Sequence, residues 1–198
     1  VEATQLAFLT DTLAPLLEKI ELEFERKVYK PSERKNVEVK FDTSALLRAD
    51  KASLAEYYNK LNYNISPTDI LVTNGGSEAI TIAMQACLNP GEEIIIPEPF
   101  YANYNGFACY SDIVVKPIMS YIDNGFALPS IAEFEKVITD KTRAIAICNP
   151  NNPTGYLYTK EEMNQIRDLV KKYDLYLFSD EVYREFCYTD APYVSAFH

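Results

Sequence analysis

The feature that most constrains the fold is a regular alternation of short apolar runs and helical segments from Ser66 onward. The runs are apolar on both faces, and most are rich in isoleucine and valine. Short apolar strands separated by helices form largely parallel sheets covered on both sides. The expected strands are Ile70–Thr73, Glu93–Ile96 (ended by Pro97), Ile113–Lys116, Arg143–Cys148 and Leu175–Ser179. We therefore predict an α/β fold, a mostly parallel sheet flanked by helices.

Three helices are expected between these strands. The first covers Ser77–Leu88 and is closed by Asn89-Pro90-Gly91. The second and third begin at capping boxes, in which a serine or threonine is followed three residues later by glutamate. These boxes are Ser130–Glu133, opening a helix through Val137, and Thr159–Glu162, opening a helix to about Tyr173.

The chain before this pattern reads as a separate N-terminal helical segment, residues 1–65, followed by an α/β domain over residues 66–198. Leucines and other apolar residues recur at helical spacing from Leu6 to Phe24, and Pro15 predicts a kink or break there. Val37–Phe41 alternates like a strand, and Ser53–Leu61 has a helical pattern.

Charge and composition exclude several classes of partner. The net charge is −10, and nucleic acid and anionic membranes both need a basic surface, so neither is expected as a partner. No stretch of 18 apolar residues and no signal peptide occurs, which favours a cytoplasmic protein. The four cysteines are far apart and are expected to be buried, reduced thiols, and one histidine gives no basis for a zinc site.

Ligands of such sheets bind outside the carboxyl ends of the strands, so the loops there carry the functional hypothesis. Asn74-Gly75-Gly76-Ser77 leads into a helix, where glycines permit close approach and free N–H groups attract phosphate. Taken alone, this sequence is equally typical of a tight turn. Pro99-Phe100-Tyr101 offers an aromatic ring that could stack on a flat heterocycle or simply pack.

The other two loops are polar. Asn149–Gly155 taken alone is a turn-rich connection from strand to helix. Asp180 follows an apolar strand, where a carboxylate is costly to bury without a partner. That partner could be an arginine, a protonated ligand nitrogen or a metal ion.

Taken together, the four loops resemble those of the class I/II aminotransferases, the aspartate aminotransferase-like family of fold-type I enzymes that use pyridoxal 5′-phosphate (PLP). The matching motifs are Thr73–Ala79, Pro99–Tyr101, Asn149–Gly155 and Ser179–Tyr183, in the order of the family, and the resemblance covers about residues 54–198. It implies the large PLP-binding domain of that fold.

The resemblance also implies a role for individual residues. Gly75, Gly76 and Ser77 would hold the PLP phosphate. Four further residues would contact the pyridine ring of PLP. Tyr101 would stack on it, Asn152 and Tyr183 would bind its 3′ oxygen, and Asp180 would pair with its nitrogen.

The family is expected to transfer an amino group between an α-amino acid and a 2-oxo acid, as a homodimer. Its catalytic lysine, which bonds covalently to PLP, lies further beyond the strand-end aspartate than the 18 residues that follow Asp180 here (198 − 180), and none of those is lysine. No catalytic residue is therefore assigned, and the chain is expected to be a fragment of a longer enzyme.

Other interpretations stay open. The chain could be a half-domain that binds PLP without a covalent bond, a PLP-dependent lyase or synthase on the same fold, or a non-catalytic interaction module. A dinucleotide-binding domain is disfavoured, because Gly75-Gly76-Ser77 lacks the G-x-G-x-x-G spacing.

Overall fold

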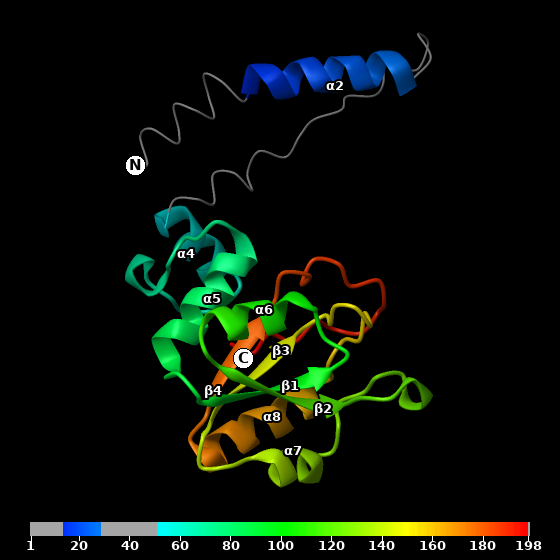
Figure 1. Ribbon diagram of the computed structural model, residues 1–198. Coiled ribbons are helices and arrows are strands. Elements are labelled where there is room, and N and C mark those ends of the chain that lie inside the picture. The colour runs from blue at the N-terminus through cyan, green and yellow to red at the C-terminus, as the bar shows by residue number, and fades with distance from the viewer. Residues whose placement is uncertain (1–13, 29–50, 198) are drawn as a thin grey trace. The chain divides into compact units, whose positions relative to one another are not determined.

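The structure, a computed structural model, describes residues 14–28 and 51–197 (Figure 1). The chain divides into two compact units, Val1–Val72 and Thr73–His198. Among the helices of the described ranges, none combines the length and the apolar character needed to cross a membrane.

The second unit contains a four-stranded sheet in which every neighbouring pair is parallel, with strand order β2-β1-β3-β4. The strands are β1 (Glu93–Glu98), β2 (Val114–Met119), β3 (Thr142–Cys148) and β4 (Tyr176–Asp180). The helices are α5 (Gly75–Cys87), α6 (Asn103–Tyr110), α7 (Ile131–Val137) and α8 (Lys160–Tyr173), with the short 3₁₀ turn η3 (Ile122–Asn124). The predicted α/β fold with a parallel sheet is confirmed.

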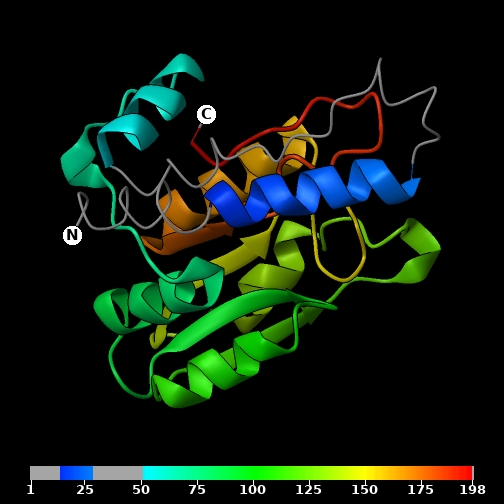
Figure 2. The same cartoon turned by 90° about the horizontal axis from the view of Figure 1, so that it is seen from above.

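Helices cover both faces of this sheet, α5 and α6 on one and α7 and α8 on the other (Figures 1 and 2). Strand β1 shows how the sequence fixes this arrangement. Ile94 and Ile96 pack in the cluster of α5 and α6, whereas Ile95 packs in the cluster of α7 and α8. Because successive side chains of a strand point to opposite faces, an unbroken apolar run is what two covered faces require.

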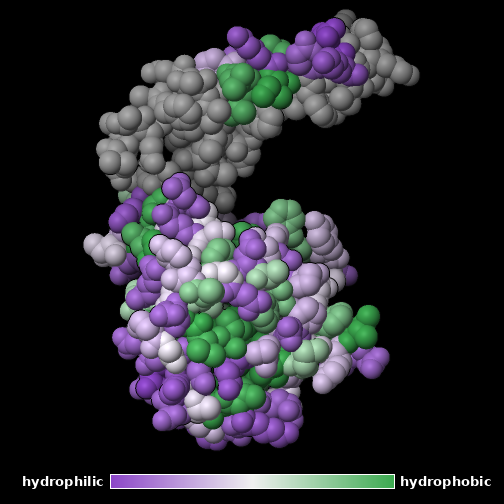
Figure 3. All heavy atoms as spheres, viewed as in Figure 1, coloured by the Kyte–Doolittle hydropathy of each residue, from purple (hydrophilic) through white to green (hydrophobic). Residues whose placement is uncertain are grey.

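Strand β2 forms one edge of the sheet, and its exposed apolar side chains include Val114 and Met119. Figure 3 shows apolar patches of this kind among predominantly hydrophilic side chains on the visible face. Pro117 lies within β2, and proline in an edge strand hinders pairing with another chain because it has no N–H to donate.

One predicted strand is missing, and two predicted strands end too early, since β2 runs to Met119, three residues beyond its predicted end at Lys116. Ile70–Thr73 forms no strand, because no described strand pairs with it, and β-propensity alone cannot replace a hydrogen-bonded neighbour. Strand β1 continues through Pro97 to Glu98 instead of ending before the proline. The missing N–H is tolerated there because β1 pairs with β3 only as far as Ile95.

The predicted helices exist, with changes at their starts. Helix α5 begins at Gly75, so the two glycines lie in its first turn instead of before it. The Thr159 capping box is formed, but Ser130 makes no side-chain capping bond, and Glu133 pairs with Lys136 instead. The backbone N–H of Glu133 donates to the Ser130 carbonyl, which is sufficient to begin α7.

The first unit contains α2 (Ala14–Val28), α4 (Lys51–Lys60) and the 3₁₀ turn η2 (Pro67–Asp69). Pro15 lies at the second residue of α2, in the first turn, where proline is tolerated, so no kink is needed. Helix α4 matches the helix expected over Ser53–Leu61. The expected strand at Val37–Phe41 and the helical pattern before residue 14 lie outside the described residues.

Because both faces of the sheet are covered, shortening a side chain buried under a helix should lower the stability of the protein far more than shortening an exposed one. Ile166 of α8 is 0% exposed, whereas Ile122 of η3 is 74% exposed. Ile166→Ala should lower the free energy of unfolding by about 2–5 kcal/mol, because it removes buried surface and leaves a cavity. The matched change Ile122→Ala should cost about 0.5 kcal/mol or less. Urea denaturation measures both, and equal losses would contradict the assignment of Ile166 to the core.

Candidate functional site

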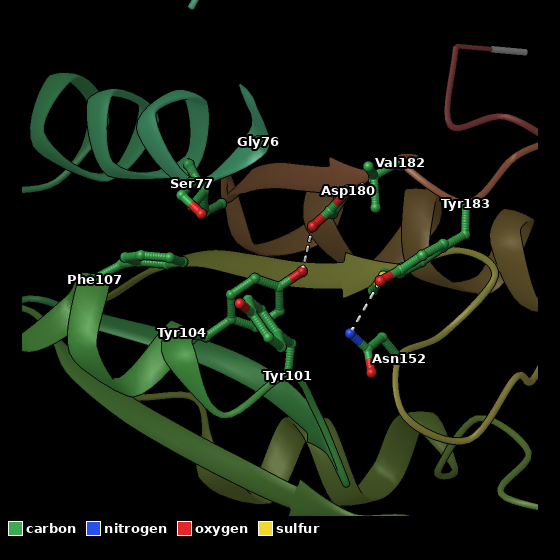
Figure 4. Close-up of a pocket in the computed structure, with 11 residues that line it drawn as sticks. Gly76, Ser77, Tyr101, Tyr104, Phe107, Asn152, Asp180, Val182 and Tyr183 are labelled. Carbon is green, nitrogen blue, oxygen red and sulfur yellow. Dashed lines mark hydrogen bonds between the residues drawn. The ribbon is translucent and has the colours of Figure 1, made fainter. Parts of the chain in front are cut away.

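A hollow of about 190 Å³ lies at the carboxyl ends of β3 and β4 (Figure 4). It is lined by six of the seven residues predicted from the sequence, Gly76, Ser77, Tyr101, Asn152, Asp180 and Tyr183. These residues come from four segments that are far apart in the sequence, namely the start of α5, the β1–α6 connection, the loop after β3 and the end of β4 with the residues that follow it. The predicted convergence of the loops at one edge of the sheet is therefore present.

The start of α5 supplies one wall of this pocket. Asn74, the N-cap residue, makes no side-chain capping bond, so it does not satisfy the N–H groups of the first turn. Gly76 and Ser77 face the pocket from that turn (Figure 4). Gly75 is not among the lining residues, and its N–H donates to the Thr73 carbonyl at 2.9 Å. Its φ of +77° is a conformation that favours glycine.

The β1–α6 connection supplies an aromatic wall. Tyr101 meets Tyr104 edge to face, with ring centroids 5.8 Å apart, and Phe107 follows one helical turn later. The Tyr101 hydroxyl accepts a hydrogen bond from the Asn103 side chain at 2.6 Å. This bond fixes the direction of a ring that lines the pocket.

Asp180 ends β4 and presents its carboxylate to the pocket. Its Oδ2 accepts a hydrogen bond from the Tyr104 hydroxyl at 2.6 Å, and its Oδ1 accepts one from the Val182 N–H at 3.1 Å. Tyr104 is not among the residues assigned from the sequence. Tyr104 follows Tyr101 by three residues, just inside the start of α6, and this spacing is the signal that could have identified it.

On the other side of the pocket, the Asn152 side chain donates to the Tyr183 hydroxyl at 3.4 Å (Figure 4). The loop that carries Asn152 is fixed by hydrogen bonds of a buried side chain at its start, that of Asn149. Asn149 is completely buried, and its side chain accepts from the Tyr158 N–H and donates to the Val194 carbonyl. A polar side chain with both ends satisfied anchors the loop at little cost in burial.

Glu181 fixes the segment that carries Tyr183. Its carboxylate accepts hydrogen bonds from the Ser195 hydroxyl and the Ala196 N–H, each at 2.9 Å. The Ser179 hydroxyl donates to the same carboxylate at 3.1 Å. The two ends of the segment from Glu181 to Ala196 are therefore joined, so that it forms a closed loop.

Cys148 lines the pocket beside Tyr104 and Asp180. Burial, together with the charge of the Asp180 carboxylate, raises the pKa of the Cys148 thiol to about 11. The thiol donates to the Pro150 carbonyl at 3.2 Å. The expectation of uniformly buried cysteines is wrong, because Cys109 is exposed.

Fold and pocket together define an α/β domain with a hollow at the carboxyl ends of a parallel sheet, the place where sheets of this kind bind ligands. Residues 31–197 match the family described as aminotransferase class I and II, and the chain belongs to that family. Its fold is that of the fold-type I aminotransferases.

Individual relatives agree with this assignment. YugH of Bacillus subtilis is 41% identical over 67% of this chain and 34% of its own length. The glutamate-pyruvate aminotransferase AlaA of Escherichia coli is 35% identical over 78% of this chain and 38% of its own length. The solved aspartate aminotransferase of Thermotoga maritima superposes with a TM-score of 0.71 at 31% identity, covering 89% of this chain and 45% of that one. The chain thus spans about a third of the length of the curated relatives.

The Glu181 contacts predict a strong effect on the segment that it closes. Glu181→Gln should weaken the bonds from Ser195 and Ala196 and cost about 1.5–3 kcal/mol, because hydrogen bonds to charged groups are stronger than neutral ones. Chymotrypsin should then cleave faster beside the exposed Tyr188, measured by mass spectrometry. Asp190→Asn, at an exposed acidic residue of the same segment, is the control. Equal cleavage rates in both variants would contradict the role of Glu181.

The raised pKa of Cys148 predicts a slow, pH-dependent thiol. In native protein at pH 8, iodoacetamide should modify exposed Cys109 well before Cys148, because only the thiolate reacts. Since the Cys148 pKa is about 11, its rate should rise about tenfold per pH unit from pH 8 to 10. Peptide mass spectrometry measures each rate. A Cys148 rate that levels off below pH 9 would contradict the assigned environment.

Proposed function

We propose that this chain is the PLP-binding part of an aminotransferase that moves an amino group between an α-amino acid and a 2-oxo acid. The proposal rests on one observation. A single pocket gathers a helix start with glycines, an aromatic ring and a carboxylate at a strand end.

The pocket residues fit the chemical groups of PLP. Its phosphate is a dianion that suits N–H groups at a helix start, its ring is flat and aromatic, and its basic nitrogen suits an anion. Each of these groups has a counterpart in a different wall of the pocket, namely α5, the β1–α6 connection and the end of β4. The oxygen beside the ring suits the amide and phenol of Asn152 and Tyr183, which already meet each other.

The proposed roles follow from this fit. The N–H groups of Gly76 and Ser77, with the Ser77 hydroxyl, would hold the phosphate. Gly75 would contribute by shaping the turn, since its own N–H is bonded to Thr73. Tyr101 would stack on the ring, and Asp180 would pair with the ring nitrogen.

Bound PLP supplies an electron sink for amino acid chemistry, and a protonated ring nitrogen deepens that sink. The proposed contribution of this chain is a carboxylate that keeps the ring nitrogen protonated. A carboxylate close to the nitrogen stabilises the protonated form by charge attraction. Asp180, with both oxygens already held by donors, is suited to this task.

Lysine is missing from the residues that line this pocket, among those that the structure describes. We therefore propose that the chain as given binds PLP reversibly. Chain with added PLP should be yellow and should lose the colour on dialysis. A yellow colour that survives dialysis, and that borohydride reduction then removes irreversibly, would indicate a covalent bond between PLP and a lysine. A colourless protein that ignores PLP would support an interaction module instead.

Substrate, assembly and location are part of the same proposal. The named relatives act on glutamate with pyruvate and on aspartate, so an α-amino acid and a 2-oxo acid are proposed without choosing among them. We further propose a homodimer in the cytoplasm, in keeping with the family. A lyase or synthase on the same fold would differ in releasing a changed carbon skeleton instead of a 2-oxo acid.

The proposed pairing with the ring nitrogen predicts the effect of two substitutions. Asp180→Asn removes the charge and should weaken binding of pyridoxine 5′-phosphate by about 10- to 100-fold, since hydrogen bonds between charged groups contribute about 1.5–3 kcal/mol. Asp180→Glu keeps the charge and should be milder. Isothermal titration calorimetry measures both, with pyridoxine 5′-phosphate chosen because it has no aldehyde to react with surface lysines. Equal affinities of wild type and Asp180→Asn would refute the pairing.

A further inference from the structure

We propose that Tyr104 is a positioning residue, whose hydroxyl holds the Asp180 carboxylate in the orientation that meets a protonated nitrogen of an aromatic ligand. This inference rests on the proposed PLP function and assigns a role to a residue that the sequence motifs leave without one. Tyr104 and Asp180 are 76 residues apart in the sequence, and their side chains meet inside the pocket (Figure 4).

Both oxygens of the Asp180 carboxylate already accept a hydrogen bond from the protein. Tyr104 donates to Oδ2 at 2.6 Å, and the Val182 N–H donates to Oδ1 at 3.1 Å. A carboxylate has about four acceptor positions, so acceptor capacity remains for a ligand. With one donor on each oxygen, the plane of the carboxylate is fixed by the protein before any ligand arrives.

Tyr104 itself is immobilised by its neighbours. Its side chain is 2% exposed and packs in the core cluster of α5 and α6. Phe100 stacks on its ring with centroids 6.2 Å apart, and Tyr101 and Phe107 contact it from two other directions. A hydroxyl on a ring held this way points in one direction, so it can set the direction of a neighbouring group.

The Tyr104 hydroxyl keeps its proton. Burial, followed by the neighbouring Cys148 and the bond to Asp180, raises the pKa of Tyr104 far above its ordinary value. Over the whole neutral range Tyr104 is therefore a donor and Asp180 its acceptor. The pair adds no second negative charge beside the carboxylate.

A purely structural role for the same bond makes a different prediction. If the bond only satisfies a buried hydroxyl, its loss should loosen the pocket and weaken every ligand alike. If the bond directs Asp180 at a ring nitrogen, its loss should weaken only ligands that have this nitrogen. The two cases are separated by changing one atom of the ligand.

The test measures binding of pyridoxine 5′-phosphate and of its 1-deaza analogue, in which CH replaces the ring nitrogen. Wild type should prefer the nitrogen-containing ligand, and Tyr104→Phe should reduce that preference by about tenfold with little change in affinity for the analogue. Circular dichroism confirms that the variant is folded. Equal weakening of both ligands, or no change in either, would overturn the positioning role.

Tyr156→Phe is the matched control. The Tyr156 hydroxyl also donates to a carboxylate, that of Glu162, at 3.0 Å, but outside this pocket. The same chemical deletion there should leave the preference between the two ligands unchanged. A loss of preference in Tyr156→Phe equal to that in Tyr104→Phe would show a general effect of stability and would contradict the proposal.

Two outcomes concern wild type alone. If wild type binds neither ligand, the proposed PLP function is refuted. If it binds both ligands equally well, the contact between Asp180 and the ring nitrogen is refuted, and the role of Tyr104 with it. Should Tyr104→Phe not fold, nuclear magnetic resonance of wild type with ¹³Cζ-labelled tyrosine replaces it. The Tyr104 signal should shift more with pyridoxine 5′-phosphate than with the analogue, and equal shifts would overturn the proposal.

Discussion

The parallel pairing of β3 with β4 is the constraint on which the site depends. It places Cys148 opposite Asp180 and continues one residue beyond β3, where the Asn149 N–H donates to the Asp180 carbonyl at 2.9 Å. Because the two strands end together, the loop with Asn152 and the segment with Tyr183 leave the sheet side by side. Buried Asn149 and the carboxylate of Glu181 then hold both connections to the segment near Ser195.

The residues around Asp180 also stabilise a partly buried charge. Asp180 sits in a pocket wall made largely of aromatic and apolar side chains, where an isolated carboxylate would be unfavourable. Tyr104 and the Val182 N–H satisfy one oxygen each. The same two bonds that make the carboxylate tolerable also orient it, so stability and preorganisation of the pocket come from one set of contacts.

Much of this could be predicted from the sequence, because apolar runs on both faces and loops at strand ends are local signals. The convergence of Gly76, Tyr101, Asn152 and Asp180 followed from the rule that parallel strands end at one edge. The predictions that were wrong or missing concern features that depend on contacts with other residues, which the local sequence does not show. Ile70–Thr73 needed a neighbouring strand, Ser130 lost its capping partner to Lys136, and Tyr104 gained its role only from a contact 76 residues away.

The central claim is that one hollow at the sheet edge holds a phosphorylated pyridine. Amide chemical shifts of the ¹⁵N-labelled chain, followed during titration with pyridoxine 5′-phosphate, test it most directly. The account predicts that Gly76, Ser77, Asn152 and Tyr183 shift together with one dissociation constant, and that inorganic phosphate shifts only the first two. Shifts scattered over the surface, or confined to the opposite end of the sheet near Arg143 and Tyr176, would contradict it.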